Sequence, residues 1–408
     1  MRVLFTTLGS PSHGRAQLPL ARALAAAGCE VLAATTAPVA EVFEQDDVRV
    51  TSCISGFNPG SHATPSQLSE ITDRTDVHPE QRRALFLRVM SQALSGPMAR
   101  DVLDAVLPVV RDFRPELILR DGMDLGSVLI GEMLGIPQLP TPSGALNAFD
   151  PAELLPGLNI LREEHGLPAH EDPLSIVPRG RIDYVPPAYS FARYLPVSRS
   201  YRQTVTVDRR SVLPRWVVDL PTDRPLVFAA IGTALPMIHE KTVDQEAGKP
   251  PFLMPDPVDT LRSIIEAAIR LDDCTVLVAT MGLPVDIDPL PSHIHITERL
   301  PQPLLLESVD LFLTHGGFNS VRESLRTATP MAVLPQFGDQ HGNAQRVEEL
   351  GLGREIIDNT PDGITTVCRQ VLADPVIGAN SRRARLATLT LPEIESAVTD
   401  LENLVGAS

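Results

Sequence analysis

A glycine pair after a short apolar run carries the clearest chemical signal in this chain. The run ends at Thr314, and His-Gly-Gly-Phe-Asn-Ser follows it. Consecutive glycines let the backbone approach a ligand closely, and the helix that follows presents free N–H groups and a positive dipole end. The pattern favours a phosphate at that helix N-terminus. An ordinary capped helix after a glycine-rich turn is an equally weighted alternative on spacing alone.

The side chains of the same segment fit the rest of a nucleotide. His315 can donate a hydrogen bond to phosphate oxygens. Glu323 lies four residues after Asn319, on the same helix face and about 6 Å along the axis. This reach suits a carboxylate that accepts hydrogen bonds from ribose hydroxyls while a diphosphate occupies the helix tip.

A second polar pair follows the next strand. Asp339 and Gln340 come shortly after Pro335 and supply a carboxylate and an amide, which suit sugar hydroxyls. Taken alone, the pair is better explained as a solvated loop. Its position directly after a strand keeps the sugar-binding interpretation open.

A histidine and an aspartate follow two strands of the N-terminal half. His13 lies in the loop from Gly9 to Gly14, and Asp121 comes directly after residues 117–120. A lone histidine at a helix start is more often a polar capping residue than a catalyst. In a parallel sheet, however, both strand ends lie on one rim, where Asp121 could hold one ring nitrogen and leave the other to take a proton.

Other familiar motifs are missing from the sequence. No GxGxxG follows the first strand, and neither a GxxxxGK[ST] nucleotide loop nor a GxSxG elbow occurs. The commonest dehydrogenase, NTPase and hydrolase classes are thereby excluded. Asp286 and Asp288 form a DxD triplet in a proline-rich turn, but no further ligands lie nearby, so we expect no metal and no bound cofactor.

The elements that position these residues alternate between strand and helix. Such β-α-β alternation predicts parallel sheets covered by helices. In the first half we predict strands at 2–8, 30–36, 117–120, 136–139 and 194–197, with helices at 15–27, 80–110 and 124–134. In the second half we predict strands at 226–231, 275–280, 293–297, 311–314 and 331–334, with helices at 258–271, 319–326, 343–350 and 392–405.

The alternation is interrupted once, which indicates two α/β domains. We predict a domain over 1–207, a linker over 208–222, a second domain over 223–391, and a C-terminal helix over 392–408 that packs back on the first domain. A long polar loop over 55–80 and an irregular, proline-rich stretch over 142–190 interrupt the first domain.

Composition bounds the class of protein. The 408 residues are 43% hydrophobic and carry a net charge of −16, with a pI near 5.1. Nucleic acid and polybasic membrane anchoring are disfavoured because both need clustered basic residues. The four cysteines are widely spaced and no signal peptide or apolar span of about 20 residues is evident. We therefore expect a soluble cytoplasmic protein.

Together these motifs resemble the donor-binding signature of the family 1 glycosyltransferases of the GT-B fold. The family includes plant UDP-sugar transferases and bacterial macrolide and antibiotic glycosyltransferases. The matching residues are Arg299-Leu-Pro-Gln302, the run from Phe312 to Ser324, Thr329-Pro330, Pro335, Asp339-Gln340 and Asn343-Ala344. The run from Thr327 to Met331 is similar to the bacterial macrolide branch.

The resemblance implies a role for each matching residue. His13 is the implied base and Asp121 its partner. Arg299 and Leu300 would flank the nucleobase. The ribose would be bound by Gln302 and Glu323, the diphosphate by His315, Gly317, Asn319, Ser320 and the loop of Gly232 and Thr233, and the sugar hydroxyls by Asp339 and Gln340.

Three features depart from the family pattern. Arg299 stands where plant members usually stack a tryptophan on uracil, which leaves UDP and TDP both open. Thr329 stands where many members have glycine. The segment 236–257 is longer than the usual connection and is interpreted as a lid over the donor.

The implied fold is α/β, with two Rossmann-like domains whose parallel sheets face each other across a cleft. The implied reaction is inverting, metal-independent transfer of a hexose or deoxyhexose from a nucleoside diphosphate sugar to a small polyketide or macrolide-like acceptor. The segments 55–80 and 142–190 would shape the acceptor site. A sugar-nucleotide 2-epimerase and a non-catalytic sugar-nucleotide-binding partner protein are the alternatives, and the oligomeric state stays open.

Overall fold

The structure is a computed structural model of the full chain. It describes residues 1–56, 79–142, 147–196, 198–202, 211–237, 255–287 and 289–407. Most of the predicted loop over 55–80, most of the predicted lid over 236–257 and the first residues of the predicted linker therefore lie outside the described residues.

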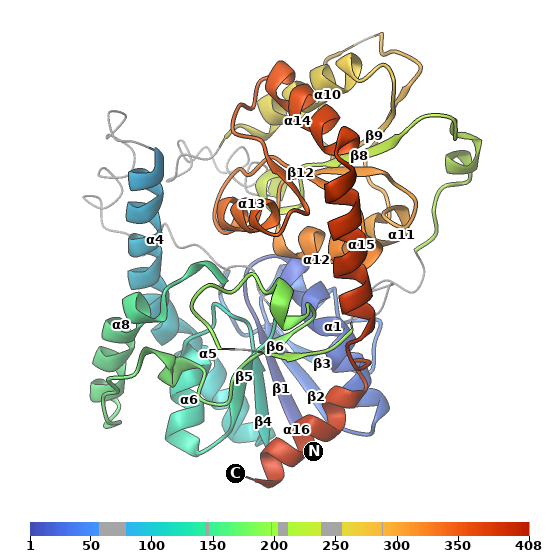
Figure 1. The fold of residues 1–408 in the computed structure, drawn as a ribbon. Coiled ribbons are helices and arrows are strands. Elements are labelled where there is room, and N and C mark those ends of the chain that lie inside the picture. The colour runs from blue at the N-terminus through green and yellow to red at the C-terminus, as the bar shows by residue number, and fades with distance from the viewer. Residues whose placement is uncertain are drawn as a thin grey trace. The chain divides into compact units, whose positions relative to one another are not determined.

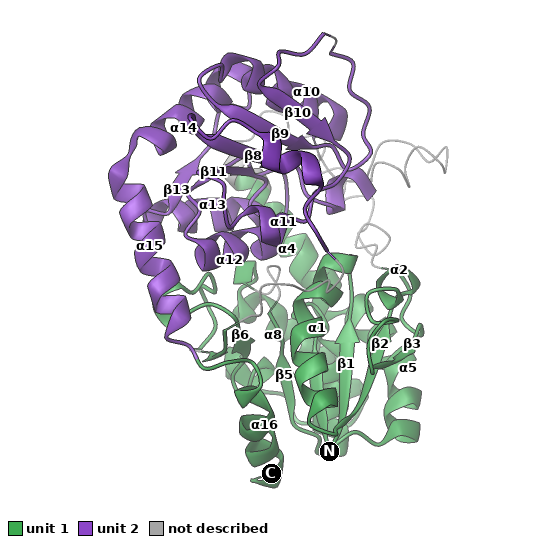
Figure 2. Ribbon diagram, turned by 90° about the vertical axis from the view of Figure 1, so that its right-hand side faces the viewer, with its two compact units in different colours: residues 1–204, 251–253, 392–408 green, residues 205–250, 254–391 purple. Residues whose placement is uncertain are grey.

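The chain folds into two compact units (Figure 2). Unit 1 contains the described residues up to 202 together with 392–407, and unit 2 contains those from 211 to 391. In the described residues, the chain passes from unit 1 into unit 2 and returns to unit 1 for its last helix. Both termini lie at one end of unit 1.

Unit 1 is built on a parallel sheet with the strand order β3-β2-β1-β4-β5 in the described residues (Figure 1). Its central strands β1 and β4 are almost wholly buried, as expected when helices cover both faces of a sheet. The strands are β1 (Arg2–Thr7), β2 (Glu30–Thr35), β3 (Arg49–Thr51), β4 (Leu117–Arg120) and β5 (Gln138–Pro140). A separate short pair is formed by β6 (Ile182–Asp183) and β7 (Arg199–Ser200).

The helices of unit 1 pack on this sheet and on one another. Within it, α5 packs against α6, and α1 contacts both α2 and the C-terminal α16. The helices are α1 (Pro11–Ala26), α2 (Ala37–Ala40), α4 (Pro79–Ser95), α5 (Pro97–Phe113), α6 (Gly126–Leu134), α8 (Pro151–Glu164) and α16 (Ser396–Gly406), with 3-10 turns η2 (Pro173–Ile176) and η3 (Pro187–Tyr189).

Unit 2 repeats the design with a parallel sheet in the order β10-β9-β8-β11-β12-β13, counted over its described residues. The strands are β8 (Leu226–Ala230), β9 (Thr275–Ala279), β10 (Ile294–Thr297), β11 (Leu311–Thr314), β12 (Met331–Val333) and β13 (Gly353–Glu355). The helices are α10 (Pro257–Arg270), α11 (Gln302–Leu305), α12 (Phe318–Thr327), α13 (Gln340–Glu349), α14 (Pro361–Ala373) and α15 (Pro375–Leu389), with the 3-10 turn η4 (Arg215–Asp219).

Residues 211–222 belong to unit 2, although the sequence analysis placed them in a linker. Leu220 is buried there, and Leu213 and Val217 pack against the same cluster, in which Phe228 and Phe312 stack with ring centroids 5.2 Å apart. This segment is therefore part of the packed layer on one face of the unit 2 sheet.

Three sequence-based element predictions are wrong. The predicted helix over 80–110 is two helices, broken at Gly96 and restarted by Pro97, whose ring cannot continue a helix. The described residues of the predicted strand over 194–197 are not a strand, and β7 begins at Arg199. Residues 151–164, predicted to be irregular, form α8, and the side chain of Asp150 caps the N–H group of Ala152 at its start.

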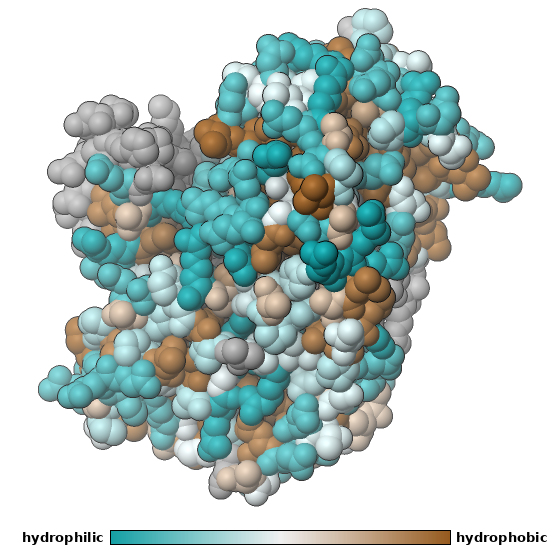
Figure 3. Space-filling model, viewed as in Figure 1, coloured by the Kyte–Doolittle hydropathy of each residue, from teal (hydrophilic) through white to brown (hydrophobic). Residues whose placement is uncertain are grey.

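The surface is mixed in polarity. On the face drawn in Figure 3, hydrophobic atoms occur in small groups among hydrophilic ones. Within the described part of the chain, no helix combines the length and the apolar character needed to cross a lipid bilayer.

Candidate active site

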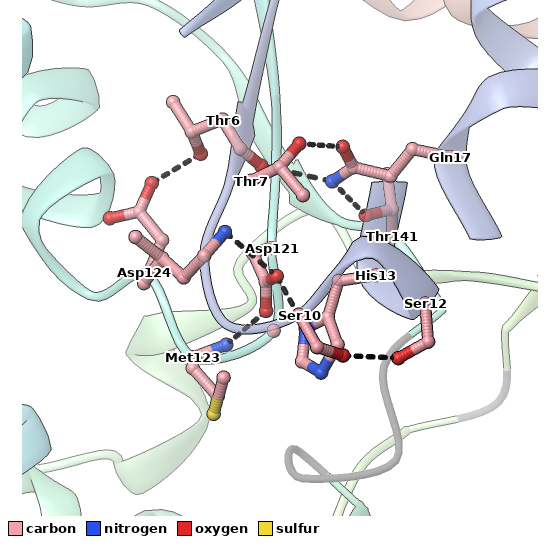
Figure 4. A network of polar contacts seen from close by, with 12 residues as sticks. Thr6, Thr7, Ser10, Ser12, His13, Gln17, Asp121, Met123, Asp124 and Thr141 are labelled. Carbon is pink, nitrogen blue, oxygen red and sulfur yellow. Dashed lines mark hydrogen bonds and ion pairs between the residues drawn. The ribbon is translucent and has the colours of Figure 1, made fainter. Parts of the chain in front are cut away.

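A histidine and an aspartate meet at the carboxyl ends of β1 and β4 in unit 1 (Figure 4). His13 lies in the first turn of α1, and its Nδ1 is 2.7 Å from Oδ2 of Asp121. The two strands are parallel neighbours with Thr6 in register with Arg120, so the segments that follow them leave the sheet side by side. The structure thus brings together the two residues that the sequence analysis paired.

Asp121 is held as a carboxylate. It is 1% exposed; Oδ2 also accepts from the backbone N–H of Leu8 at 3.1 Å, and Oδ1 accepts from that of Met123 at 3.0 Å. Burial alone would raise its pKa, but the facing His13 and the two backbone N–H donors bring the pKa of Asp121 below its usual value. An ionised Asp121 accepts from Nδ1–H, which leaves the lone pair of His13 on Nε2.

The second nitrogen of His13 faces a glycine. Gly9 has a φ of +76°, and a Cβ built on it would lie 3.3 Å from both Cε1 and Nε2 of His13. Any other residue at this position would carry backbone strain and crowd the imidazole of His13. The side chain of His13 keeps 23% exposure, so Nε2 belongs to a ring that a reacting group can reach.

A buried amide anchors the helix that carries His13 (Figure 4). Gln17 follows His13 by one turn of α1 and is 1% exposed. Its Nε2 donates to the carbonyl of Thr6 at 2.9 Å and to Oγ1 of Thr141 at 2.8 Å, and its Oε1 accepts from the hydroxyl of Thr7. Sequence reasoning missed Gln17, although its spacing of four residues from His13 places both on one helix face.

In unit 2, the imidazole of His315 lies between two glycines. A Cβ on Gly232, which has a φ of +79°, would lie 2.4 Å from Cε1 of His315, and a Cβ on Gly317 would lie 2.4 Å from Nε2. The three residues meet because β8 and β11 are neighbours, with Ala230 in register with Thr314. The ring occupies space that any other residue at either glycine would fill.

His315 is neutral at physiological pH. Burial lowers its pKa to about 4, and an interaction with the backbone at Ala230 raises it only in part. Its Nδ1 is buried and has no hydrogen-bond partner in the described structure. An unpartnered buried nitrogen in a glycine-lined turn is an unusual feature that a hydrogen-bonding ligand would satisfy.

The depressed pKa predicts a loss of stability in acid. Between pH 6.5 and about 4 the unfolded chain protonates His315 and the folded chain does not, so stability falls as the pH falls through this window. At pH 5 the contribution is on the order of 2 kcal/mol. Urea unfolding at pH 7 and pH 5 should show a smaller pH-dependent loss for His315→Gln than for the wild type. Equal losses in the two proteins would contradict the prediction.

The helix after this turn begins at a glycine N-cap. α12 begins at Phe318, its N-cap is Gly317, and no side chain of the described residues caps it. The N–H groups of its first turn are therefore directed to whatever lies beyond the helix end. Asn319 and Ser320 belong to this first turn, four and five residues after His315 in the sequence.

A polar triad lies one turn further along α12. Nε2 of Gln302 donates to Oε2 of Glu323 at 2.7 Å and is 3.2 Å from Oγ of Ser320. Gln302 begins α11, so two separate elements contribute to the triad. The structure therefore joins the two residues that the resemblance assigns to the ribose.

The turn after β12 is tied to the glycine pair. Nδ2 of Asn343 donates to the carbonyl of Gly316 at 2.9 Å and to Oδ2 of Asp339 at 2.8 Å. Oε1 of Gln340 accepts from the backbone N–H groups of Gln336 and Phe337 at 2.9 and 3.3 Å. The oxygen of Gln340 is thus used within the turn, and its amide nitrogen is the group that can serve a ligand.

For the remaining residues predicted to bind the donor sugar nucleotide, the structure gives local surroundings only. Arg299 has 71% of its side chain exposed and pairs with Glu298 at 3.5 Å, whereas Leu300 packs against the cluster under β8. Thr233 directly follows Gly232 after β8. Asp286 of the DxD triplet is exposed and pairs with Arg262 at 3.6 Å, and Asp288 lies outside the described residues.

The chain is similar to proteins of antibiotic biosynthesis. Residues 262–404 match the family model for the C-terminal domain of erythromycin biosynthesis protein CIII-like proteins. Aclacinomycin-T 2-deoxy-L-fucose transferase of Streptomyces galilaeus is 24% identical over 461 residues, covering 100% of this chain and 96% of that protein.

Solved structures share the whole fold. The glycosyltransferase SnogD of Streptomyces nogalater superposes with a TM-score of 0.71 at 20% identity, covering 99% of both chains. Spinosyn rhamnosyltransferase SpnG with bound thymidine diphosphate gives 0.74 at 22% identity, covering 98% of this chain and 100% of that one. SpnG has also been solved with spinosyn aglycone.

The chain has the GT-B fold, and its named relatives are natural-product glycosyltransferases. The predicted fold class and the predicted enzyme class are confirmed. The epimerase and the non-catalytic partner protein are not favoured, because the named relatives are transferases.

One departure of this glycosyltransferase from its family pattern has a structural explanation. Thr329 is 2% exposed, and its hydroxyl donates to the carbonyl of Leu306 at 2.9 Å and lies 2.6 Å from the hydroxyl of Thr327. A threonine in place of glycine therefore ties the end of α12 to the segment after α11, and its buried hydroxyl is satisfied.

Proposed function

We propose that this glycosyltransferase moves a hexose or deoxyhexose from UDP or TDP to a hydroxyl of a polyketide or macrolide-type natural product, with inversion. The observation that carries the proposal is the 2.7 Å contact between Nδ1 of His13 and Asp121, which leaves Nε2 as the basic nitrogen. The glycosyltransferase assignment and the relatives that act on antibiotic precursors support the choice of substrate class.

The proposed reaction is a single displacement. The acceptor oxygen attacks the anomeric carbon while its proton passes to Nε2 of His13, and the bond from that carbon to the diphosphate oxygen breaks. The electron pair leaves with the nucleoside diphosphate. Asp121 stabilises the imidazolium that forms. One displacement without an enzyme nucleophile inverts the anomeric centre.

The donor is proposed to bind on unit 2. Negative charge grows on the diphosphate as the bond breaks, and the N-terminus of α12 together with His315 would stabilise that charge. Gln302 and Glu323 would hold the ribose, and Asp339 with the amide of Gln340 the sugar. In this proposal dipole and side chains neutralise the diphosphate, so neither a metal ion nor a cofactor besides the donor sugar takes part.

The other proposed properties follow from the sequence. The partners are the nucleotide sugar and the small acceptor, and neither nucleic acid nor membrane is one of them. The cytoplasm is the proposed location, because the four cysteines are all free, as a reducing compartment would keep them.

A donor and acceptor panel tests the proposed function. The protein is incubated with UDP- and TDP-sugars and with polyketide and macrolide aglycones, and products are read by mass. A mass gain of one hexose or deoxyhexose, with an inverted anomeric proton coupling by NMR, is expected. Turnover of the sugar nucleotide without an acceptor, giving an epimer, would instead favour the epimerase.

Glu323→Ala should weaken nucleotide binding. Loss of a hydrogen bond to a charged group costs about 1.5–3 kcal/mol, which corresponds to about 10- to 100-fold in the Kd for UDP or TDP. Calorimetric titration measures the change. Glu349→Ala, which removes an exposed carboxylate paired with Arg346 on α13, is the control and should leave the Kd unchanged. An unaltered Kd in Glu323→Ala would reject the ribose role.

A further inference from the structure

Arg120 is a buried cation that directly precedes Asp121 in the chain. It is the last residue of β4, it precedes Asp121, and it is 0% exposed. Arginine is almost never fully buried unless its charge is paired. The burial of Arg120 between the sheet and the loop that carries Asp121 therefore has to be explained by the groups that it contacts.

The guanidinium of Arg120 contacts several backbone carbonyl oxygens of the loop that carries Asp121. Nη1 lies 3.3, 3.4 and 3.1 Å from the carbonyl oxygens of Asp121, Gly122 and Asp124. Nη2 donates to the carbonyl of Ile176 at 2.8 Å. Nε donates to Oε1 of Gln138 at 2.7 Å. All of these acceptors are uncharged oxygens, and four of them belong to the backbone.

This clamp determines the surroundings of Asp121. The loop held by Arg120 includes Met123, whose N–H donates to Oδ1 of Asp121. Ile176 ends η2, which the same guanidinium joins to the loop, and Nε2 of Gln138 also donates to the carbonyl of Ile176 at 3.2 Å. A shift of the loop would move Asp121 and one of its donors together.

The buried charge acts in addition to the clamp. Burial lowers the pKa of Arg120 to about 10, and the carboxylates of Asp124 and Asp121 act against this, so the guanidinium stays charged at neutral pH. An apolar side chain of similar length would avoid the desolvation cost. The presence of a charged arginine at position 120 is therefore better explained by its electrostatic effect on Asp121 and Asp124 than by packing.

We propose that Arg120 is a positioning residue of the His13–Asp121 pair: it holds the loop 121–124 by its carbonyl groups and keeps a positive charge beside the Asp121 carboxylate. The kinetic part rests on the proposed function. The electrostatic part concerns the free protein alone. The charged and titratable groups that contact one another here are His13 on α1 and Arg120, Asp121 and Asp124 around the end of β4.

Two substitutions separate charge from geometry. Arg120→Met removes both, and Arg120→Lys keeps the charge but cannot reach all the carbonyls. Arg162→Met is the matched control, since Arg162 is also 0% exposed in unit 1 but pairs with Glu132 at 2.9 and 2.8 Å on the neighbouring α6. For each variant, the melting temperature, kcat, KM for the acceptor and the NMR titration of His13 are measured.

In Arg120→Met, kcat should fall by about 10- to 100-fold, the loss typical of a small misplacement of a catalytic group. The pKa of His13 should rise, because a positive charge on the neighbouring loop no longer opposes the imidazolium. The acidic limb of the pH–rate profile then moves to higher pH. Arg120→Lys should return the pKa of His13 to near the wild-type value while kcat stays reduced. Arg162→Met should lower stability only.

The titration makes the two proposals separable. It needs no substrate, so a raised pKa of His13 in Arg120→Met would support the electrostatic role even if no sugar transfer were found. If Arg120→Met and Arg120→Lys both leave the His13 titration and kcat per folded molecule as in the wild type, the proposal is overturned. If Arg120→Met does not fold, Arg120→Lys with wild-type kcat overturns the clamp.

Discussion

Replacing His13 by alanine should lower kcat by about 10²- to 10⁴-fold, which is the usual contribution of a general base. The reason is that no other group takes the acceptor proton in the proposed displacement. Nucleotide affinity should be nearly unchanged, because the residues proposed to bind the donor belong to unit 2. Single-turnover product formation and calorimetric titration with UDP or TDP measure the two quantities separately.

Replacing Asp121 by asparagine should lower kcat almost as much as replacing His13 by alanine. Asp121 accepts three hydrogen bonds, from His13 and from the N–H groups of Leu8 and Met123. In Asp121→Asn, the amide group must face one of these donors, which either turns the imidazole to the wrong tautomer or disrupts the loop. The variant that combines His13→Ala with Asp121→Asn should have a kcat close to that of the less active single variant, because the two residues act as one unit.

An exposed histidine provides the control for these substitutions. His170 is 41% exposed in unit 1 and lies 4.0 Å from Glu132, so His170→Ala removes an imidazole away from the proposed chemistry. Its kcat should equal that of the wild type. Wild-type turnover in His13→Ala would remove His13 from the mechanism, whatever the control shows.

The candidate residues could be predicted because they stand where strands end. Apolar runs ending at Thr7, Arg120, Ala230 and Thr314 form strands, and parallel register brings the residues after neighbouring strands together. The contacts of His13 with Asp121 and of His315 with Gly232 follow from that rule. Motif spacing within α12 likewise predicted the region of Glu323.

Other parts of the site could not be predicted, because they depend on packing rather than on periodicity. Arg120 occupies a position in a buried strand where a hydrophobic residue is expected, and its partners include Ile176, which lies 56 residues later. The neutral state of His315 depends on burial between two glycines. Neither feature has a signature in local sequence.

The sequence analysis missed helix α8 for a different reason, which is the proline content of the segment. Proline-rich composition favoured an irregular segment, yet Asp150 and Pro151 form a standard helix start, and Leu154, Leu158 and Leu161 are buried at helical spacing. Proline at the first helical position is favourable, whereas in the interior it breaks a hydrogen bond. Pro156 nevertheless lies inside α8, so this helix is indicated by its capped start and by the spacing of its buried leucines rather than by its proline content.

Gly232→Ala should cause the second large loss, this time in donor binding. The added Cβ would lie 2.4 Å from Cε1 and 2.5 Å from Nε2 of His315, far inside van der Waals contact, so the imidazole must move. In the proposed donor site the ring then no longer meets the diphosphate. We expect the Kd for UDP or TDP to rise by about 30- to 100-fold, corresponding to loss of a charge-assisted hydrogen bond and a distorted turn.

A second glycine separates the contact from backbone strain. Gly28 has a φ of +83° and no atom within 4 Å of a built Cβ, so Gly28→Ala carries the left-handed strain of about 1–2 kcal/mol without a steric contact. Both variants should lose stability, but only Gly232→Ala should lose nucleotide affinity. If Gly232→Ala bound nucleotide as tightly as Gly28→Ala does, the imidazole of His315 would have no part in holding the diphosphate. Charge stabilisation would then rest on the N-terminus of α12 alone.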